Sequence, residues 1–262
     1  MQPKPDFYDA RYGAAFQEAG VARSYRYRPT YPAATFDVLA DLITDSPRHV
    51  LDAGCGTGAI ALPLVERVDR IDAVDVSQEM INQGKQLPSG DHPYLTWIIG
   101  RVEDAPLQPP YALITTGQSI HWMDWYVVMP RFAQMLTPRG FLAILDVDDV
   151  APPWQDGLVQ IIKRYSTIPR WQAYDHIKGL EERGLFQQHG TWRSEPFHFT
   201  QSLDDYIESF HARASFARGR MAPANIQAFD EEVRALVSSY SHDVVELQIV
   251  AEIVWGKPLK GN

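Results

Sequence analysis

Three glycines alternate with other residues after an apolar run and an aspartate, in Leu51-Asp52-Ala53-Gly54-Cys55-Gly56-Thr57-Gly58. Glycine adopts positive φ at little cost and has no side chain, so the backbone of such a loop can approach a ligand closely. Backbone N–H groups in a tight turn also offer hydrogen-bond donors to polar groups of that ligand. The segment 52–58 is therefore predicted to bind a cofactor.

Two classes of cofactor bind loops of this kind, and the spacing of the glycines separates them. Dinucleotide sites follow G-x-G-x-x-G, whereas the glycines here follow G-x-G-x-G, with Asp52 two residues before the first. A carboxylate at that position would repel a pyrophosphate but would accept a hydrogen bond from an ammonium group. S-adenosylmethionine carries an ammonium group and no phosphate, so the spacing favours it over NAD.

Further carboxylates stand where the next two predicted strands end. Asp75 lies 21 residues after Gly54, where an acidic residue accepts hydrogen bonds from the ribose hydroxyls of an adenosyl cofactor. Asp75 would otherwise be a solvated loop residue beside a helix N-cap. Glu103 and Asp104 are candidates to accept from the adenine amine. Three apolar residues would sandwich the ring or serve as plain core: Val76, Met80 and Val102.

Several segments resemble the motifs of class I S-adenosylmethionine-dependent methyltransferases. HVLDAGCGTGAIALPL resembles motif I, VDVSQEMI the acidic second motif, and GRVEDAPL the adenine-binding loop. TTGQSIHWMDW resembles the fourth motif of the small-molecule branch, near the trans-aconitate methyltransferase group, and PRGFLAILD is similar to the turn and fifth strand. VARSYRYRPTYP is similar to an N-terminal segment in which a tyrosine and an arginine close over the cofactor's carboxylate. The resemblance covers residues 20–147, and the remaining C-terminal third matches only loosely.

The resemblance implies S-adenosylmethionine as cofactor and a methyl transfer to a small-molecule acceptor. The acceptor atom is left open between oxygen, nitrogen and carbon, and the reaction is an in-line SN2 displacement. In the N-terminal segment the implied cofactor-binding residues are Tyr25 and Arg28. The other motifs add Arg101, Thr116, Gly117, Gln118 and Trp122.

His121 follows the fourth predicted strand and is the candidate general base, because imidazole titrates near neutral pH. A base is needed only if the acceptor is protonated at the working pH. The alternative is a histidine that packs on Trp122 and shapes the wall of the pocket. No set of histidine and carboxylate residues has the helical spacing of metal ligands, so no metal site is predicted.

The elements that must position these residues alternate between strand and helix. Apolar strands are predicted at 49–53, 70–76, 94–99, 111–116 and 141–147, with helices between them. This alternation predicts right-handed crossovers and a parallel sheet that binds ligands at the carboxyl ends of its strands. With later strands at 186–199 and 244–256, we expect an α/β fold: a Rossmann-like, seven-stranded, mostly parallel sheet with helices on both faces and a helical cap.

One methyltransferase domain is expected over residues 1–262, with its core at about 33–148 and the two later strands. Residues 1–32 are dense in aromatic and arginine side chains, which suit a lid over a ligand or a helix packed on the core. Residues 150–185 and 201–241 are expected to form the cap. Its aromatic residues would line a roomy pocket for a planar or acyl-type acceptor or form the cap's own core: Trp154, Tyr165, Trp171, Tyr174, Tyr206, Phe210 and Phe216. Three arginines would meet an acidic substrate or lie in solvent: Arg213, Arg218 and Arg220.

Composition excludes several classes of protein. With 24 Lys and Arg against 33 Asp and Glu, the net charge is −9, so no nucleic-acid partner is expected. A hydrophobic content of 45% rules out a mainly disordered chain, and one cysteine excludes a disulfide framework. No run approaches about 18 apolar residues and no secretory signal is visible, so we expect a cytoplasmic protein with no membrane partner. The oligomeric state is left open.

Three functions remain compatible with the sequence. The first is a small-molecule methyltransferase, which the complete set of motifs favours. The second is a non-catalytic S-adenosylmethionine-binding module, because intact motifs indicate binding better than turnover. The third is an NAD-dependent oxidoreductase, which the glycine spacing disfavours.

Overall fold

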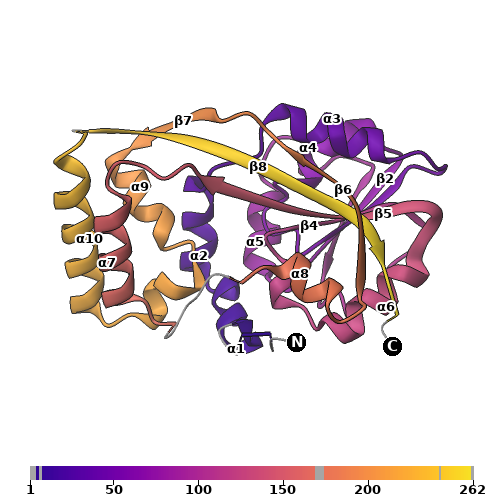
Figure 1. Ribbon diagram of the computed structural model, residues 1–262, viewed down its shortest axis with the longest axis horizontal. Coiled ribbons are helices and arrows are strands. Elements are labelled where there is room, and N and C mark those ends of the chain that lie inside the picture. Colours follow the sequence, from indigo (N-terminus) through magenta and orange to yellow (C-terminus); the bar gives the residue numbers. More distant parts are fainter. Residues whose placement is uncertain (1–3, 6–7, 169–173, 242, 261–262) are drawn as a thin grey trace.

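Strands and helices alternate through the first half of the chain, and both continue through the second half (Figure 1). The structure is a computed structural model that describes residues 4–5, 8–168, 174–241 and 243–260. The strands are β1 (His49–Ala53), β2 (Arg70–Asp75), β3 (Leu95–Ile99), β4 (Tyr111–Gly117), β5 (Leu136–Asp149), β6 (Phe186–Arg193), β7 (Phe197–Ser202) and β8 (Val244–Pro258). The α-helices are α1 (Ala10–Gly13), α2 (Ala19–Ser24), α3 (Ala33–Leu42), α4 (Ala61–Leu64), α5 (Gln78–Gly84), α6 (Trp125–Met135), α7 (Gln155–Tyr165), α8 (His176–Glu181), α9 (Leu203–Phe210) and α10 (Pro223–Ser238). Short 3-10 helices are η2 (Ala14–Gln17), η3 (Tyr25–Tyr27), η4 (Val65–Arg67), η5 (Ile120–Trp122), η6 (Ala214–Phe216) and η7 (Arg218–Arg220).

The strands form one sheet in the order β3-β2-β1-β4-β5-β8-β6, and β7 also pairs with β8. Pairing is parallel from β3 to β5, and β8 runs antiparallel to its three partners. The expected mostly parallel α/β sheet is therefore confirmed. Because β1, β2 and β4 are parallel neighbours, their carboxyl ends bring the predicted cofactor residues to one edge of the sheet.

The segment 186–199, expected as one strand, forms two strands along the same edge of β8. After β6 ends, the Ser194 amide donates to the Ala251 carbonyl at 2.9 Å, and the Ala251 amide donates to Ser194 Oγ at 3.0 Å. Pro196 has no backbone N–H to continue the ladder, and β7 begins one residue later. The sheet consequently has eight strands where seven were predicted.

Helices cover both faces of the sheet and bury its apolar side chains. Neighbouring residues of β1 show the alternation, because Val50 lies in the cluster that includes Leu39 of α3, whereas Leu51 lies in the cluster that includes Phe132 of α6. Helix α4 packs on the first of these faces and α8 on the second. Buried strands of this kind read as continuous apolar runs, which is how the sequence indicated them.

Strands β5 and β8 extend beyond the core and carry the helical cap, which comprises α7, α9, α10, η6 and η7 (Figure 1). Four of the aromatic residues weighed as a pocket lining are buried together in the interior of the cap: Trp154, Tyr206, Phe210 and Phe216. Tyr165 packs against this cluster, whereas Tyr174 stacks on Trp125 of the core. Trp171 lies outside the described residues. The four buried residues and Tyr165 therefore form the cap's own core, which is the second of the two interpretations that the sequence allowed.

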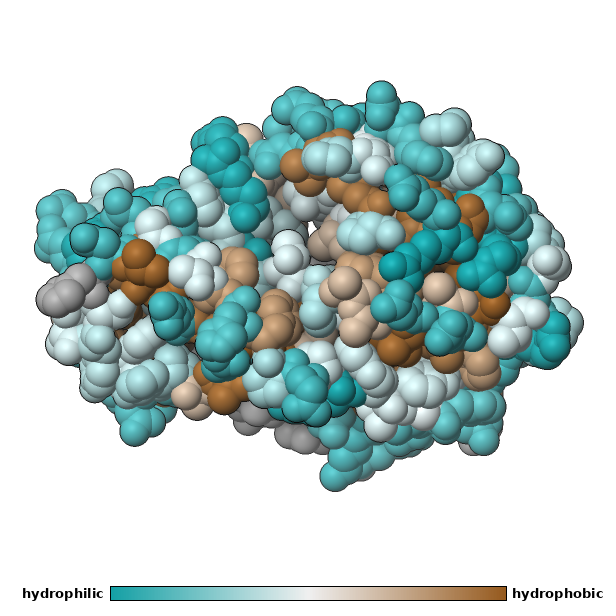
Figure 2. All heavy atoms as spheres, turned by 90° about the horizontal axis from the view of Figure 1, so that it is seen from above, coloured by the Kyte–Doolittle hydropathy of each residue, from teal (hydrophilic) through white to brown (hydrophobic). Residues whose placement is uncertain are grey.

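The face seen in Figure 2 carries mainly hydrophilic side chains with several hydrophobic patches among them, and it shows a hollow between the cap and the core. In Figure 1 the N-terminal segment, with α1 and α2, lies between these two parts. No helix in the described part of the chain is long and apolar enough to cross a membrane. Within the same residues, no group of three or more histidine, cysteine or carboxylate side chains is placed to hold a metal ion.

Candidate active site

The glycine loop adopts the backbone conformation that its sequence predicts. Gly54, Gly56 and Gly58 have φ values of 72°, 54° and 86°. A Cβ atom at Gly54 would lie 2.5 Å from Ser119 Cβ, and one at Gly58 would lie 2.8 Å from the Trp97 ring, so packing requires glycine at both positions. A Cβ atom at Gly56 would meet only the Tyr25 ring, at 3.7 Å. Of the three glycines, Gly56 is thus the one at which a Cβ atom would meet no clash.

The loop does not offer the free N–H groups that its sequence suggested. The amides of Gly54 and Cys55 both donate to the Val74 carbonyl, at 2.8 and 2.9 Å. The Gly56 amide donates to Asp75 Oδ2 at 2.8 Å, and the Gly58 amide donates to the Cys55 carbonyl at 2.8 Å. The expectation of free donors is therefore wrong for these four amides, because β2 already satisfies three of them and the turn itself the fourth.

Two adjoining cavities of about 230 and 40 Å³ lie at this edge of the sheet and share Tyr25, Gly54, Gly117 and Gln118. Besides these four, the predicted cofactor residues that line the larger cavity are Gly56, Asp75, Val76, Met80, Arg101, Val102, Glu103 and Trp122. Those that line the smaller cavity are Arg28, Asp52 and Cys55. Six predicted site residues line neither cavity: Ala53, Thr57, Gly58, Asp104, Thr116 and His121.

Asp75 has the geometry expected of a ribose-binding carboxylate. Its Oδ1 accepts from the Ser77 amide and its Oδ2 from the Gly56 amide, both at 2.8 Å, which fixes the side chain at the larger cavity. Ser77 is the N-cap of α5, and its Oγ accepts from the Met80 amide. Burial raises the pKa of Asp75, and the backbone hydrogen bonds oppose that rise. Each carboxylate oxygen keeps acceptor capacity for a ligand hydroxyl.

Asp52 is a buried carboxylate without a counter-charge. Its side chain is 1% exposed, accepts from Thr115 Oγ1 at 2.9 Å and from the Ala61 amide at 3.2 Å, and forms no ion pair with any described residue. Burial raises the pKa of Asp52 to about 7. A buried carboxylate beside a cavity is stabilised when a cation arrives. The smaller cavity therefore suits the ammonium group of S-adenosylmethionine.

Binding of an ammonium ligand is expected to depend on the ionisation of Asp52. With the pKa raised to about 7, most Asp52 is protonated at pH 6, and the ligand prefers the ionised form. Affinity for S-adenosylhomocysteine, which carries the same ammonium group, should rise by up to about tenfold per pH unit below pH 7 and level off above it. Calorimetric titration between pH 5.5 and 8.5 measures this slope.

Asp52→Asn is the matched variant, because it keeps the shape of the side chain and removes the titration. Its affinity should be nearly independent of pH, whereas Asp104→Asn, outside both cavities, should keep the wild-type profile. The same slope in Asp52→Asn and wild-type protein would remove Asp52 from the ammonium site.

Tyr25 lines both cavities, and Arg28 lines the smaller one. Arg28 Nη2 donates to Gln118 Oε1 at 2.6 Å, and its guanidinium carbon lies 5.1 Å from the centroid of the Tyr25 ring. Gln118 Nε2 in turn donates to the Val147 carbonyl at 3.0 Å. Gln118 has a φ of 50°, which is uncommon for a residue other than glycine. The strained Gln118 thus joins the N-terminal segment to β5 at the junction of the two cavities.

The opposite end of the larger cavity has the groups expected around adenine. Met80 and Val102 are buried at its wall, with Val76 more exposed beside them. Glu103 also lines the cavity, but its Oε1 already accepts from the Asp124 amide at 3.1 Å and pairs with Arg101 Nη2 at 3.3 Å. Asp104 is exposed and lines neither cavity, so of the two carboxylates only Glu103 is placed to meet the ligand.

His121 packs in a group of rings beside the site. Its ring stacks on His176 with a centroid separation of 5.1 Å and an interplanar angle of 20°. The rings of Tyr8 and Trp122 also pack against it, with centroid separations of 4.8 and 4.9 Å. Burial and the neighbouring His176 hold the pKa of His121 well below its usual value. The imidazole is therefore neutral at physiological pH and is a weak base.

Several residues of the site escaped the sequence analysis. The larger cavity is also lined by residues from the N-terminal helices, namely Gly13, Ala14, Phe16 and Gln17. Asp146 stands next to residues that hold Gln118, because the Gln118 amide donates to the Leu145 carbonyl and its side chain to Val147. Burial, with Asp148 and Glu252 nearby, raises the pKa of Asp146 to about 7. Asp146 lies within β5 and lines neither cavity, and the fifth predicted strand, 141–147, already contained it.

Comparison with known proteins agrees with this geometry. Residues 50–140 match the model of a methyltransferase domain family. An uncharacterised methyltransferase of Mycobacterium tuberculosis is 32% identical over 141 residues, and this match spans 53% of the chain and about half, 55%, of that relative. Trans-aconitate 2-methyltransferase of Yersinia pestis is 29% identical over 218 residues, covering 77% of this chain and 80% of that enzyme. A protein from Anaeromyxobacter dehalogenans, named as a type II methyltransferase, superposes with a TM-score of 0.61 at 22% identity over 88% of this chain and 97% of its own, which shows a shared fold.

The fold, the glycine loop with its two carboxylates, and the family match define one class. Residues 50–140 carry a methyltransferase domain, and the fold and the glycine loop resemble those of class I S-adenosylmethionine-dependent methyltransferases. Its cofactor is S-adenosylmethionine, as the spacing of the glycines predicted. The carboxylates at the two cavities fit the ammonium and hydroxyl groups of that cofactor.

Proposed function

We propose that this chain transfers a methyl group from S-adenosylmethionine to a small-molecule acceptor by in-line SN2 displacement. One observation carries the proposal: the two cavities meet beside Gln118 at the carboxyl end of β4, where Tyr25 lines both of them and Arg28 lines the smaller one. Cavities of this size, partly walled by the N-terminal segment, suit a small molecule better than a segment of a folded macromolecule.

The residues of the chain have to bind, orient and enclose the reactants. When bound, the cofactor supplies a methyl group on a positively charged sulfur. In our proposal Asp52 holds the ammonium group and Asp75 the ribose hydroxyls, which sets the direction in which the methyl group points. Arg28 and Gln118 close the space around it. Alignment of this kind lowers a barrier by several kcal/mol, up to about 7–11 in the best cases.

Arg213 is the arginine available to an acidic acceptor. Arg218 and Arg220 pair with carboxylates, whereas Arg213 forms no ion pair with the described residues and lies over the Phe210 ring at 4.7 Å. Asp148 and Asp149 lie near enough to influence it. One relative is named for methylating trans-aconitate, which is an acid. Carboxylic acids therefore come first among the acceptors that we would test.

The remaining assignments extend the same proposal. We assign residues 1–32 as a lid and residues 150–185 and 201–241 as a cap on a single methyltransferase domain. The net charge of −9 supports a protein without a nucleic-acid partner, and we place it in the cytoplasm with no membrane partner.

Calorimetry with S-adenosylhomocysteine and NADH tests the proposal first. We expect binding of S-adenosylhomocysteine alone, followed by methyl transfer from labelled S-adenosylmethionine to a member of a panel of acids, phenols and amines. Binding of NADH alone would replace the proposal with an oxidoreductase. Binding of S-adenosylhomocysteine with no transfer to any class in the panel would favour a non-catalytic binding module.

His121→Asn is expected to lower kcat by less than about tenfold, whereas loss of a general base lowers it by about 10²–10⁴. The ring lines neither cavity, and its low pKa means that the wild-type rate should not fall at the usual pKa of histidine. Rates with the identified acceptor between pH 5.5 and 8.5 measure both effects. His176→Asn, in the stacked partner, is the matched control. A loss of 10² or more in His121→Asn alone, with unchanged S-adenosylhomocysteine affinity, would make His121 the base.

A further inference from the structure

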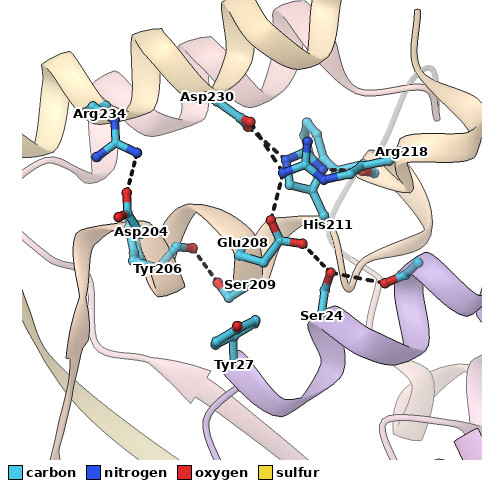
Figure 3. Close-up of polar contacts among 12 residues, drawn as sticks. Ser24, Tyr27, Asp204, Tyr206, Glu208, Ser209, His211, Arg218, Asp230 and Arg234 are labelled. Carbon is cyan, nitrogen blue, oxygen red and sulfur yellow. Dashed lines mark hydrogen bonds and ion pairs between the residues drawn. The ribbon is translucent and has the colours of Figure 1, made fainter. Parts of the chain in front are cut away.

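Ser24 ends α2 and is attached to the cap through Glu208 of α9 (Figure 3). Ser24 is 2% exposed, and its Oγ lies 2.5 Å from Glu208 Oε1 and 3.1 Å from the Gly20 carbonyl oxygen. Glu208 Oε2 accepts from Arg218 Nη2 at 2.7 Å. A hydroxyl bonded to an ionised carboxylate makes a stronger contact than two neutral groups.

Other cap residues hold Glu208 in place. Arg218 Nη2 also lies 3.4 Å from Asp230 Oδ2, and Asp230 Oδ1 lies 2.8 Å from His211 Nε2 (Figure 3). The second ring nitrogen of His211 contacts the Phe216 carbonyl at 2.8 Å. Burial alone would raise the pKa of Glu208, but the bonds from Arg218 and Ser24 outweigh burial and lower it. Ser24 therefore contacts an ionised carboxylate that is held in place. This carboxylate belongs to α9 and is linked to α10 through Arg218 and Asp230.

The position of Ser24 determines where the residues over the cofactor cavities lie. Tyr25 follows it directly and covers Gly56, and Arg28 reaches Gln118 at 2.6 Å. A shift of Ser24 towards solvent would carry both side chains away from the glycine loop.

Other residues of α2, and its N-cap Glu18, also contact the cap. Glu18 Oε1 accepts from Arg220 Nε at 3.0 Å. The buried Val21 and Ala22 pack in one cluster with Ala214 and Ala217 of the cap side and with Met80 of α5. Because Met80 also lines the larger cavity, α2 lies between the cap and the cofactor site.

We propose that Glu208 is a positioning residue for the cofactor site: through Ser24 it holds Tyr25 and Arg28 over the glycine loop and so couples the cap to cofactor binding. This inference rests on the proposed function, because it takes the two cavities to hold the cofactor. Coupling is reciprocal, so a bound cofactor in turn stabilises the contact between α2 and the cap.

Ser24→Ala, Glu208→Gln and the double variant test the coupling, with S-adenosylhomocysteine as the probe. Asp204→Asn is the matched control. Asp204 lies on α9 one turn before Glu208, and it pairs with Arg234 of α10 at 2.5 Å, so its ion pair lies wholly within the cap (Figure 3). Calorimetry gives the affinity. Trypsin cleavage at the exposed Arg23 and Arg26, with and without the probe, reports whether the segment is held.

Each single variant should bind S-adenosylhomocysteine roughly 3- to 30-fold more weakly than wild-type protein. The probe should protect Arg23 and Arg26 less in these variants, and the double variant should lose little more than the weaker-binding single variant, because both remove one contact. Asp204→Asn should match wild-type protein in both measurements. A purely structural role for Glu208 would lower Tm without changing the protection that the probe gives.

If Ser24→Ala and Glu208→Gln kept the wild-type affinity and the wild-type protection against trypsin, this inference would be overturned, but the proposed function would not. An equal loss in Asp204→Asn would also overturn it, because the effect would then be a general weakening of the cap. Wild-type protein that fails to bind S-adenosylhomocysteine would overturn the proposed function, and this inference with it.

Discussion

Gly56→Val is expected to weaken S-adenosylhomocysteine binding by at least about 100-fold, which corresponds to about 2.7 kcal/mol. Gly56 lines the larger cavity with a φ of 54°, and the atoms nearest to a Cβ atom there would belong to Tyr25, at 3.7 Å or more. A β-branched side chain would therefore extend into the space of the cofactor and would resist the left-handed backbone. Gly54→Val is a poorer test, because Ser119 leaves no room for its Cβ atom and the fold itself would change.

Gly184→Val separates backbone strain from occupation of the cavity. Gly184 has a φ of 65° and lines neither cavity, so valine there suffers similar strain away from the site. We expect the two variants to lose a similar amount of stability, about 1–3 kcal/mol, in thermal unfolding. Only Gly56→Val should lose affinity in calorimetry. A folded Gly56→Val protein that binds within threefold of wild type would mean that the cofactor does not approach Gly56.

The parallel sheet and the edge that binds the ligand could be predicted because both follow from local sequence. Buried parallel strands are short apolar runs, and the residues that come directly after them necessarily meet at one edge. Asp52 and Asp75 were placed correctly at the cavities for this reason. That the loop amides already have acceptors could not be predicted. The Val74 carbonyl, which accepts from two of them, belongs to another strand, and its position depends on the register between β1 and β2.

Contacts between distant segments were the least accessible to sequence reasoning. Arg28 meets Gln118 and Ser24 meets Glu208 across separations of 90 and 184 residues. The motif resemblance pointed to Arg28 and Gln118 separately, but not to the contact between them, and it did not point to Glu208. An aromatic residue of the cap, such as Phe210, is equally suited to a pocket wall and to a hydrophobic core. Its location therefore cannot be predicted from its type, and only the packed structure shows it.

Asp75→Asn should weaken S-adenosylhomocysteine binding by about ten- to a hundredfold, the loss expected for a charge-assisted hydrogen bond of about 1.5–3 kcal/mol. Both oxygens of Asp75 accept backbone amides, from Gly56 and Ser77. The amide nitrogen of asparagine cannot accept, so one backbone donor loses its partner whichever way the side chain turns. Some loss of stability will accompany the loss of affinity, and thermal unfolding has to be measured beside calorimetry. Asp104→Asn is the control, because this exposed carboxylate lies outside both cavities.

The ligand itself can show whether the lost contact is the one to ribose. An analogue of S-adenosylhomocysteine without the 2′ and 3′ hydroxyls should bind wild-type protein weakly and Asp75→Asn almost equally weakly. Replacement of Asp75 and removal of the hydroxyls would then be non-additive, which is the signature of groups in direct contact. Full additivity would mean that Asp75 acts only by shaping the loop through Gly56, and equal affinity of Asp75→Asn and wild-type protein for S-adenosylhomocysteine would remove Asp75 from the site. Because Asp75 anchors the loop and faces the cavity at once, only this comparison separates its two roles.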